Sequence, residues 1–216
     1  MAEQTVRRRR QLVVVDWIRR APATYLWLTL LAGTTTVLVN LRPAAQQHLL
    51  VTWSTNLHNL GRDPVQVLLA SALWTDAASL AVYAVLFTAL LAPAEHWLGT
   101  GRWLIIAVVG HVGATLISVG DLAADLSEHA ADPRLADDVD VGVSYALVAL
   151  CAVLTYRIPY PWRWIYLAGG LALLIPPVIW HGTVTDIGHL SALLIGLLCY
   201  PLTRGRRFST RAGHSP

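Results

Sequence analysis

Two side chains of this sequence, Ser144 and His189, are of the types that nucleophilic catalysis uses. Ser144 follows an acid-rich stretch and lies in the apolar run "GVSYALVAL", and His189 lies in a second run, "GHLSALLIGLL". A Ser hydroxyl is a weak nucleophile until an adjacent base takes its proton, and a His side chain suits that task near neutral pH. The two residues are candidates for a Ser–His dyad, or for polar packing groups of two apolar helices.

The composition places both runs in a membrane. Hydrophobic residues make up 55% of the 216 residues and charged residues only 13%, whereas a soluble domain carries about 25% charged residues. The sixteen basic residues are all Arg. We therefore expect an all-α integral membrane protein that lies in a lipid bilayer, with no nucleic-acid partner.

Six apolar segments are long enough to cross a hydrocarbon layer of roughly 30 Å as helices. They span residues 24–41, 76–94, 103–120, 141–156, 164–180 and 185–202. If the six alternate in direction, thirteen of the sixteen arginines fall on one side, and the positive-inside rule places that side in the cytoplasm with both termini. Residues 1–23 are then an Arg-rich cytoplasmic segment, residues 24–202 a six-helix membrane domain, and residues 203–216 a basic cytoplasmic tail.

Ser144 and His189 are expected at similar depths, because the fourth and sixth segments both run from the outer to the inner side. Each residue lies about one turn, or roughly 6 Å, inside its expected helix start. An Asp or Thr side chain can cap such a start by accepting from free N–H groups. The expected caps are Asp138 or Asp140 for the fourth segment and Thr185 or Asp186 for the sixth. Equal depth does not make the two helices neighbours.

Two outer connections differ in character. Residues 42–75 are too apolar for a free loop, so we expect parts of them to lie at the membrane surface. Residues 121–140 hold seven acids and one Arg, which indicates a solvated loop or a charged rim over a site.

Three stretches resemble the rhomboid family of intramembrane serine proteases. Residues 94–103, "AEHWLGTGRW", are similar to the segment in which a Glu ends the second helix and a Gly-rich turn leads into the third. "GVSYALVAL" resembles the Gly-x-Ser-Gly segment that opens the fourth helix, and "GHLSALLIGLL" the His-x-x-Gly-x-x-x-Gly face of the sixth. The simplest bacterial rhomboids also have six spans with both ends inside, and a surface-lying loop after the first.

This resemblance implies a site. Ser144 would be the nucleophile and His189 the general base in hydrolysis of a peptide bond in or near a substrate's transmembrane segment. Counting back from Glu95, Ser79 and Tyr83 occupy the positions of the family's His and Asn oxyanion donors, and each carries a hydroxyl. The resemblance implies no metal or cofactor, a transmembrane protein as substrate or client, and a bacterial plasma membrane as location.

The sequence departs from the family at several positions. Tyr145 stands where the second Gly of Gly-x-Ser-Gly is expected, and Ala192 replaces a Gly of the sixth helix. In an alternative register, Tyr145 matches a family aromatic below the nucleophile, and Val141 takes the catalytic position. We favour the Ser144 register because it keeps Gly142 two residues before the serine. If the dyad forms, the Ser144 Oγ and a ring nitrogen of His189 should lie within about 4 Å.

These departures leave more than one function open. The loss of an oxyanion donor typically costs about 10²–10³ in rate, so the chain is either a protease or a rhomboid-fold protein that binds membrane helices without cleaving them. His111, in the middle of the third segment, is a functional candidate or an interhelical hydrogen-bonding residue. A small transporter or channel using His111, His189 and Asp76 is disfavoured, because the sequence has no internal repeat.

Overall fold

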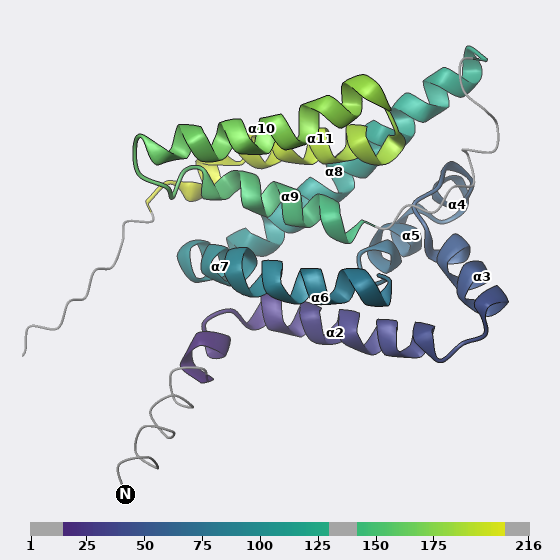
Figure 1. Ribbon diagram of the computed structural model, residues 1–216, viewed down its shortest axis with the longest axis horizontal. Helices are drawn as coiled ribbons and strands as arrows, with labels where there is room; N and C mark the ends of the chain where they lie inside the picture. The colour runs from purple at the N-terminus through teal and green to yellow at the C-terminus, as the bar shows by residue number, and fades with distance from the viewer. Residues whose placement is uncertain (1–14, 130–141, 206–216) are drawn as a thin grey trace, which may run out of the picture.

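The computed structural model describes residues 15–129 and 142–205, and all regular elements in these ranges are helical (Figure 1). The α-helices are α2 (Pro22–Val39), α3 (Pro43–Trp53), α4 (Leu57–Arg62), α5 (Pro64–Ser71), α6 (Ala77–Leu86), α7 (Ala92–Leu98), α8 (Thr100–Ser127), α9 (Val143–Leu154), α10 (Trp162–Trp180) and α11 (Val184–Leu198). A π-helical turn, η1 (Phe87–Leu91), joins α6 to α7, and a 3-10 turn, η3 (Tyr200–Thr203), follows α11.

Within residues 15–129 and 142–205, four helical stretches are long and apolar enough to cross a membrane: α2, the continuous stretch Ala77–Leu98, α8 and α10. They correspond to the predicted first, second, third and fifth segments. The fourth and sixth segments correspond to α9 and α11, which are apolar but have only 12 and 15 residues. At 1.5 Å per residue these helices are about 18 and 23 Å long, shorter than the hydrocarbon layer. The six predicted segments are all helical, and the number that cross the membrane stays a prediction.

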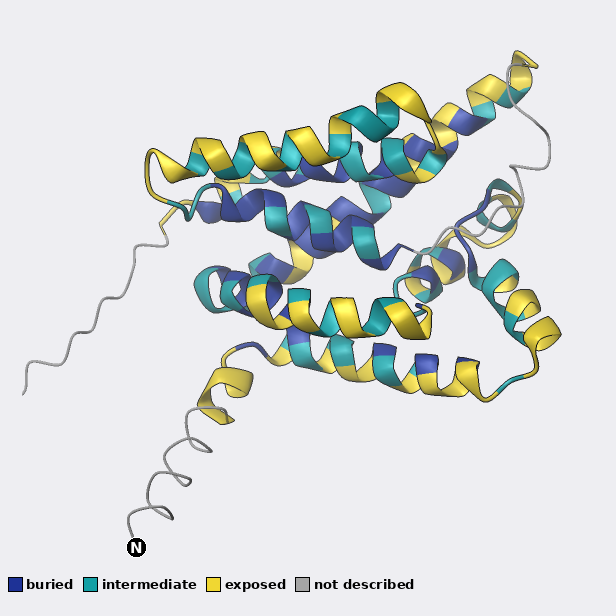
Figure 2. Cartoon of the chain, in the orientation of Figure 1, coloured by how far each residue is buried: buried dark blue, intermediate teal, exposed yellow. Residues whose placement is uncertain are grey.

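The centre of the bundle is α9, which packs against both α8 and α11. Most of its residues are buried, whereas no residue of α10 is (Figure 2). Glycines let the central helices approach closely: a Cβ on Gly110 of α8 or on Gly196 of α11 would collide with Ala149 of α9. The short α9 is therefore a core helix held between two neighbours.

Glu95 of α7 fixes the start of α2. Its carboxylate, 1% exposed, accepts hydrogen bonds from the backbone N–H groups of Ala23 (3.0 Å) and Thr24 (2.8 Å). It also accepts from the hydroxyls of Thr24 and of Thr100, which opens α8, both at 2.7 Å. Since the N-cap residue of α2, Ala21, makes no side-chain cap hydrogen bond, Glu95 supplies that role and joins three helices.

The outer connections are more helical than the sequence indicates. Residues 42–75 contain α3, α4 and α5. This agrees with the expectation that the connection is not a free loop. The prediction of a loop from residue 121 is wrong over its first part, because α8 continues to Ser127 and includes Asp121 and Asp125. Hydropathy marks where a helix leaves lipid, and a helix can continue beyond that point into water. Residues 130–141 lie outside the described ranges.

Both predicted helix caps are corrected by the structure. The N-cap residue of α9 is Gly142; Asp138, Asp140 and Val141 lie outside the described residues. The cap of α11 is Thr183, whose hydroxyl accepts from the Asp186 N–H at 3.2 Å, while the Asp186 carboxylate binds back to Thr183. Asp186 is thus the third residue of a capping box, and Thr185 lies inside the helix.

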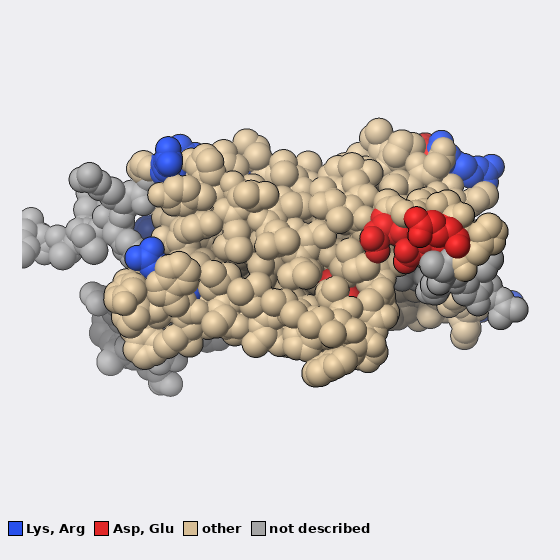
Figure 3. Space-filling model, turned by 90° about the horizontal axis from the view of Figure 1, so that it is seen from above, with Lys and Arg blue, Asp and Glu red and all other residues tan. Residues whose placement is uncertain are grey.

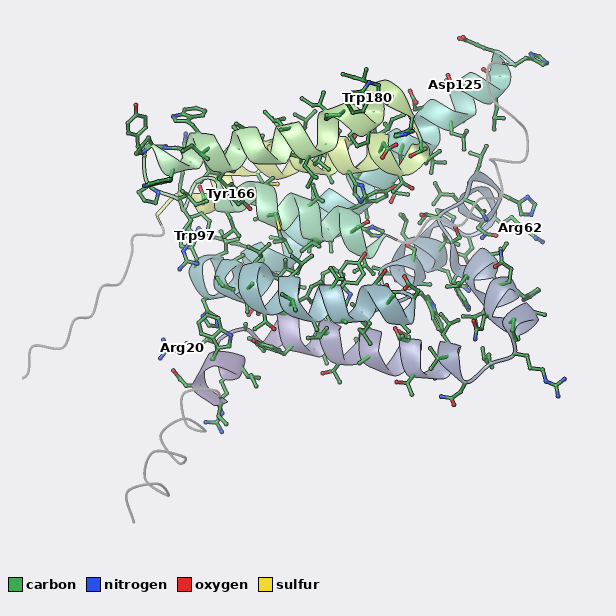
Figure 4. The ribbon with its side chains drawn as sticks, in the orientation of Figure 1. Arg20, Arg62, Trp97, Asp125, Tyr166 and Trp180 are labelled. Carbon is green, nitrogen blue, oxygen red and sulfur yellow. The ribbon has the colours of Figure 1, made fainter. Side chains whose placement is uncertain are left out.

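Charged side chains separate toward the two ends of the bundle. Figure 4 shows Arg20 and Trp97 at the end opposite Arg62 and Asp125, and in Figure 3 the acidic side chains gather at one end of an uncharged surface. The end that we call arginine-rich carries Arg19, Arg20, Arg102, Arg157, Arg163 and Arg204. The end that we call acidic carries Asp63, Asp76, Asp121, Asp125, Glu128 and Asp186.

Candidate active site

Ser144 is the second residue of α9 and is half-buried. Its side chain lies near the Tyr83 hydroxyl of α6. The structure therefore brings together the candidate nucleophile and one of the two oxyanion candidates, which lie 61 positions apart in the sequence.

Ser79, the other oxyanion candidate, belongs to the start of α6. Its N–H donates to the Asp76 carboxylate at 2.9 Å, as does that of Ala78, and its side chain is hydrogen-bonded to the same carboxylate. The Ser79 hydrogen bonds hold the pKa of Asp76 below its usual value, against the opposing effect of desolvation. The Ser79 hydroxyl thus stabilises a helix cap.

His189 lies on α11 beside the residue that follows Ser144. The Tyr145 ring packs edge-on against the His189 ring, with 5.3 Å between centroids and 79° between planes. Tyr145 is fully buried, and its ring stands over Gly188, in the space that a Cβ there would need. Tyr145, which departs from the family pattern, is accommodated by the glycine before His189.

The helix starts of α9 and α11 are not level with each other. Ser144 is the second residue of α9, and because α11 begins at Val184, His189 is its sixth. Counted from the helix starts the two positions differ, but Ser144 and His189 lie at a similar depth, as expected, because Tyr145, next to Ser144, contacts His189 and Gly188. The sequence leaves open whether the two helices are neighbours. In the structure α9 and α11 pack side by side, and the Tyr145 ring contacts the His189 ring.

The comparisons with known proteins decide the family. The family model described as "Rhomboid-like protein" matches residues 16–209. The chain belongs to the rhomboid-like protein family. This finding confirms the resemblance to the rhomboid family, and together with the long apolar helices it makes the chain a multi-pass membrane protein. Comparisons with curated proteins and with solved structures found no match.

His111 of this rhomboid-like protein supports the start of α9. It is buried on α8, and its Nε2 lies 2.8 Å from the Leu68 carbonyl oxygen and 3.3 Å from the Ser71 Oγ. A Cβ on Gly142 would collide with the His111 ring, and the Gly142 N–H donates to the Ser71 carbonyl at 3.1 Å. The interhelical hydrogen-bond interpretation of His111 is confirmed.

The sequence did not indicate that His111 helps to place α9. Gly142 is the feature that pointed to such a contact, because a glycine at a helix N-cap also permits close approach of another group. In the rhomboid-like protein, His111 links α5, α8 and the turn that leads to Ser144.

Proposed function

We propose that this rhomboid-like protein is an intramembrane serine protease that hydrolyses peptide bonds in or near the transmembrane segments of other proteins. The setting of Ser144 supports it: this residue lies in the first turn of α9, whose N-cap residue, Gly142, makes no side-chain cap hydrogen bond, and its side chain lies near the Tyr83 hydroxyl. The first N–H groups of a helix have no acceptor within it and carry a partial positive charge. They can stabilise a negative charge that forms beside Ser144.

The proposed reaction uses a dyad of Ser144 and His189. The Ser144 Oγ attacks the carbonyl carbon of the scissile bond while His189 takes the hydroxyl proton. The carbonyl oxygen becomes an oxyanion that accepts hydrogen bonds from the first N–H groups of α9 and from the Tyr83 hydroxyl. His189 then gives its proton to the leaving amine, and an acyl ester on Ser144 remains. Water, deprotonated by His189, hydrolyses this ester and restores both side chains.

Tyr145 has a positioning role in this proposal. Its buried ring contacts one edge of His189, which restricts how the imidazole can turn. Ser144 and Tyr145 are consecutive, so they point about 100° apart around α9. Ser144 faces Tyr83 of α6, and Tyr145 faces α11.

The proposed topology has six membrane-crossing helices with the arginine-rich end in the cytoplasm. The excess of arginines at one end of the bundle supports it, because only Arg42 and Arg62 of the described arginines lie at the acidic end. Residues 1–23 and 203–216 would then be cytoplasmic, residues 24–202 would form the membrane domain, and Ser144 would open toward the outer side. A bacterial plasma membrane is the proposed location.

Labelling with a fluorophosphonate probe, which reacts with activated serines, tests the protease directly. We expect the purified protein to be labelled and the label to be lost in Ser144→Ala and in His189→Ala. Ser118→Ala is the matched control, because Ser118 is a buried membrane serine that donates only to its own helix, to the Thr115 carbonyl at 3.2 Å. Absence of label in the parent protein, or label that persists in Ser144→Ala, would refute the protease.

A second function, binding of client membrane helices without cleavage, is favoured by Tyr145. A large buried ring occupies the space beside His189 where the family pattern has a glycine on α9. In that case a client helix should bind the protein and its Ser144→Ala variant equally, and no cleaved fragment should form. Fluorescence transfer between a labelled client and the protein in vesicles measures the binding.

A further inference from the structure

A cavity of about 690 Å³ opens between α2, α5 and α8, and its lining includes neither Ser144 nor His189. Its walls are almost wholly hydrophobic, with Thr100 at one end and His111 toward the other. The volume is within the range of about 300–1,000 Å³ that is usual for small-molecule sites. No step of the proposed proteolysis uses this cavity.

The cavity extends along the bundle. Along α8 its lining runs from Thr100 to Val112, which is about 18 Å at 1.5 Å per residue. A hydrophobic space of that length suits an extended hydrocarbon chain.

One end of the cavity lies at the arginine-rich end. Pro22 lines it, and Arg19 and Arg20, three and two residues before Pro22, are exposed. Arg20 forms an ion pair with Asp16 at 2.7 Å, so these three side chains leave one net positive charge. Such a cluster beside a membrane span attracts anionic lipid headgroups.

We propose that the cavity between α2, α5 and α8 binds one acyl chain of an anionic phospholipid, whose headgroup lies by Arg19 and Arg20. The lipid comes from the leaflet at the arginine-rich end, and its chain runs parallel to α2 and α8. The site is independent of Ser144, so loss of proteolysis leaves it intact.

Native mass spectrometry of the full-length protein, with phosphatidylglycerol or phosphatidylcholine added to the detergent, tests the site. We expect one phosphatidylglycerol to be retained in preference to phosphatidylcholine. Val108→Trp, which fills the cavity, should lower this retention by about tenfold or more, because the acyl chain loses its apolar contacts. Val109→Trp is the matched control: Val109 is 47% exposed, close to the 57% of Val108, and does not line the cavity.

One milder change keeps the test decisive if Val108→Trp fails to fold. Changing Arg19 and Arg20 to Gln should abolish the preference for phosphatidylglycerol, while Arg62→Gln at the acidic end should not. Equal retention by the Val108→Trp and Val109→Trp variants, a preference unchanged by the changes at Arg19 and Arg20, or equal binding of both lipids by the parent protein would overturn the proposal.

Discussion

The two faces of α9 are built differently. Toward α11 the helices interlock: the Tyr145 ring stands over Gly188, and the Ala149 carbonyl lies against Gly196. Toward α6 the contact is polar and half-buried, with the Ser144 side chain near the Tyr83 hydroxyl. A close-packed face has no room for an added atom and fixes two helices relative to each other, whereas half-buried hydroxyls can exchange partners.

The proposed chemistry needs both kinds of face. A general base must be held in one place, which the interlocked face does for His189 through Tyr145. A nucleophile must instead leave its resting partner and meet a substrate, which the polar face permits for Ser144. Changing one face at a time should therefore separate stability from catalysis.

Tyr145→Ala should have the largest effect, because it empties the interlocked face. Removing a fully buried aromatic ring costs about 3–5 kcal/mol in soluble cores, since the cavity collapses only partly. We expect a loss of unfolding free energy of that order in a denaturant titration in detergent. Tyr145→Phe is the control, because it keeps the ring over Gly188; a similar loss in both variants would show that the hydroxyl, rather than packing, is what matters.

Tyr83→Phe should act on catalysis alone. It removes the hydroxyl beside Ser144 and keeps the ring that packs on Phe87. If Tyr83 stabilises the oxyanion, the rate of substrate cleavage in vesicles should fall by about 10²–10³, with unfolding unchanged. Tyr166→Phe is the control, because its hydroxyl donates to the Cys151 carbonyl at 2.9 Å, away from Ser144. An unchanged rate in Tyr83→Phe would remove it from the site.

The two faces also differ in how far the sequence predicts them. Counting back from Glu95 gives Tyr83 as an oxyanion candidate, and in the structure its hydroxyl lies near Ser144. Regular helical spacing carries such a count reliably along one chain segment. The family match and the apolar runs likewise agree with the all-helical membrane fold expected from composition.

The interlocked face was not predictable, because it depends on pairs of residues from different helices. Tyr145 looked like an obstacle until Gly188 was seen beneath its ring, and the sequence gives no measure of which helices touch. The cap of α11 was expected at Thr185 or Asp186 but is Thr183. By residue type alone, Thr183 and Thr185 suit an N-cap equally well. Only the turn geometry distinguishes them.

Gly196→Ala tests the interlocked face at its other contact. The new Cβ would meet the carbonyl group of Ala149, and backbone yields less readily than a flexible side chain. Overpacking of this kind costs about 1–3 kcal/mol, measured as above. Gly169→Ala on α10 is the control, because nothing lies within 4 Å of a Cβ there. Equal stability of the two variants would mean that α9 and α11 are not closely packed at Gly196.

Asp76→Ala should have the smallest effect, at the outer edge of the polar face. Asp76 caps α6 through the N–H groups of Ala78 and Ser79, and loss of such a cap costs about 1 kcal/mol. Because the folded-state pKa of Asp76 is lowered, its contribution is present above the ordinary Asp pKa, near 4, and is lost as pH falls through the folded value. The stability difference between parent and variant should therefore be full at pH 7 and shrink below about pH 4, whereas Asp125→Ala, at the far end of α8, should show no such difference. A difference that stayed constant down to low pH would show that the carboxylate charge contributes nothing to the cap.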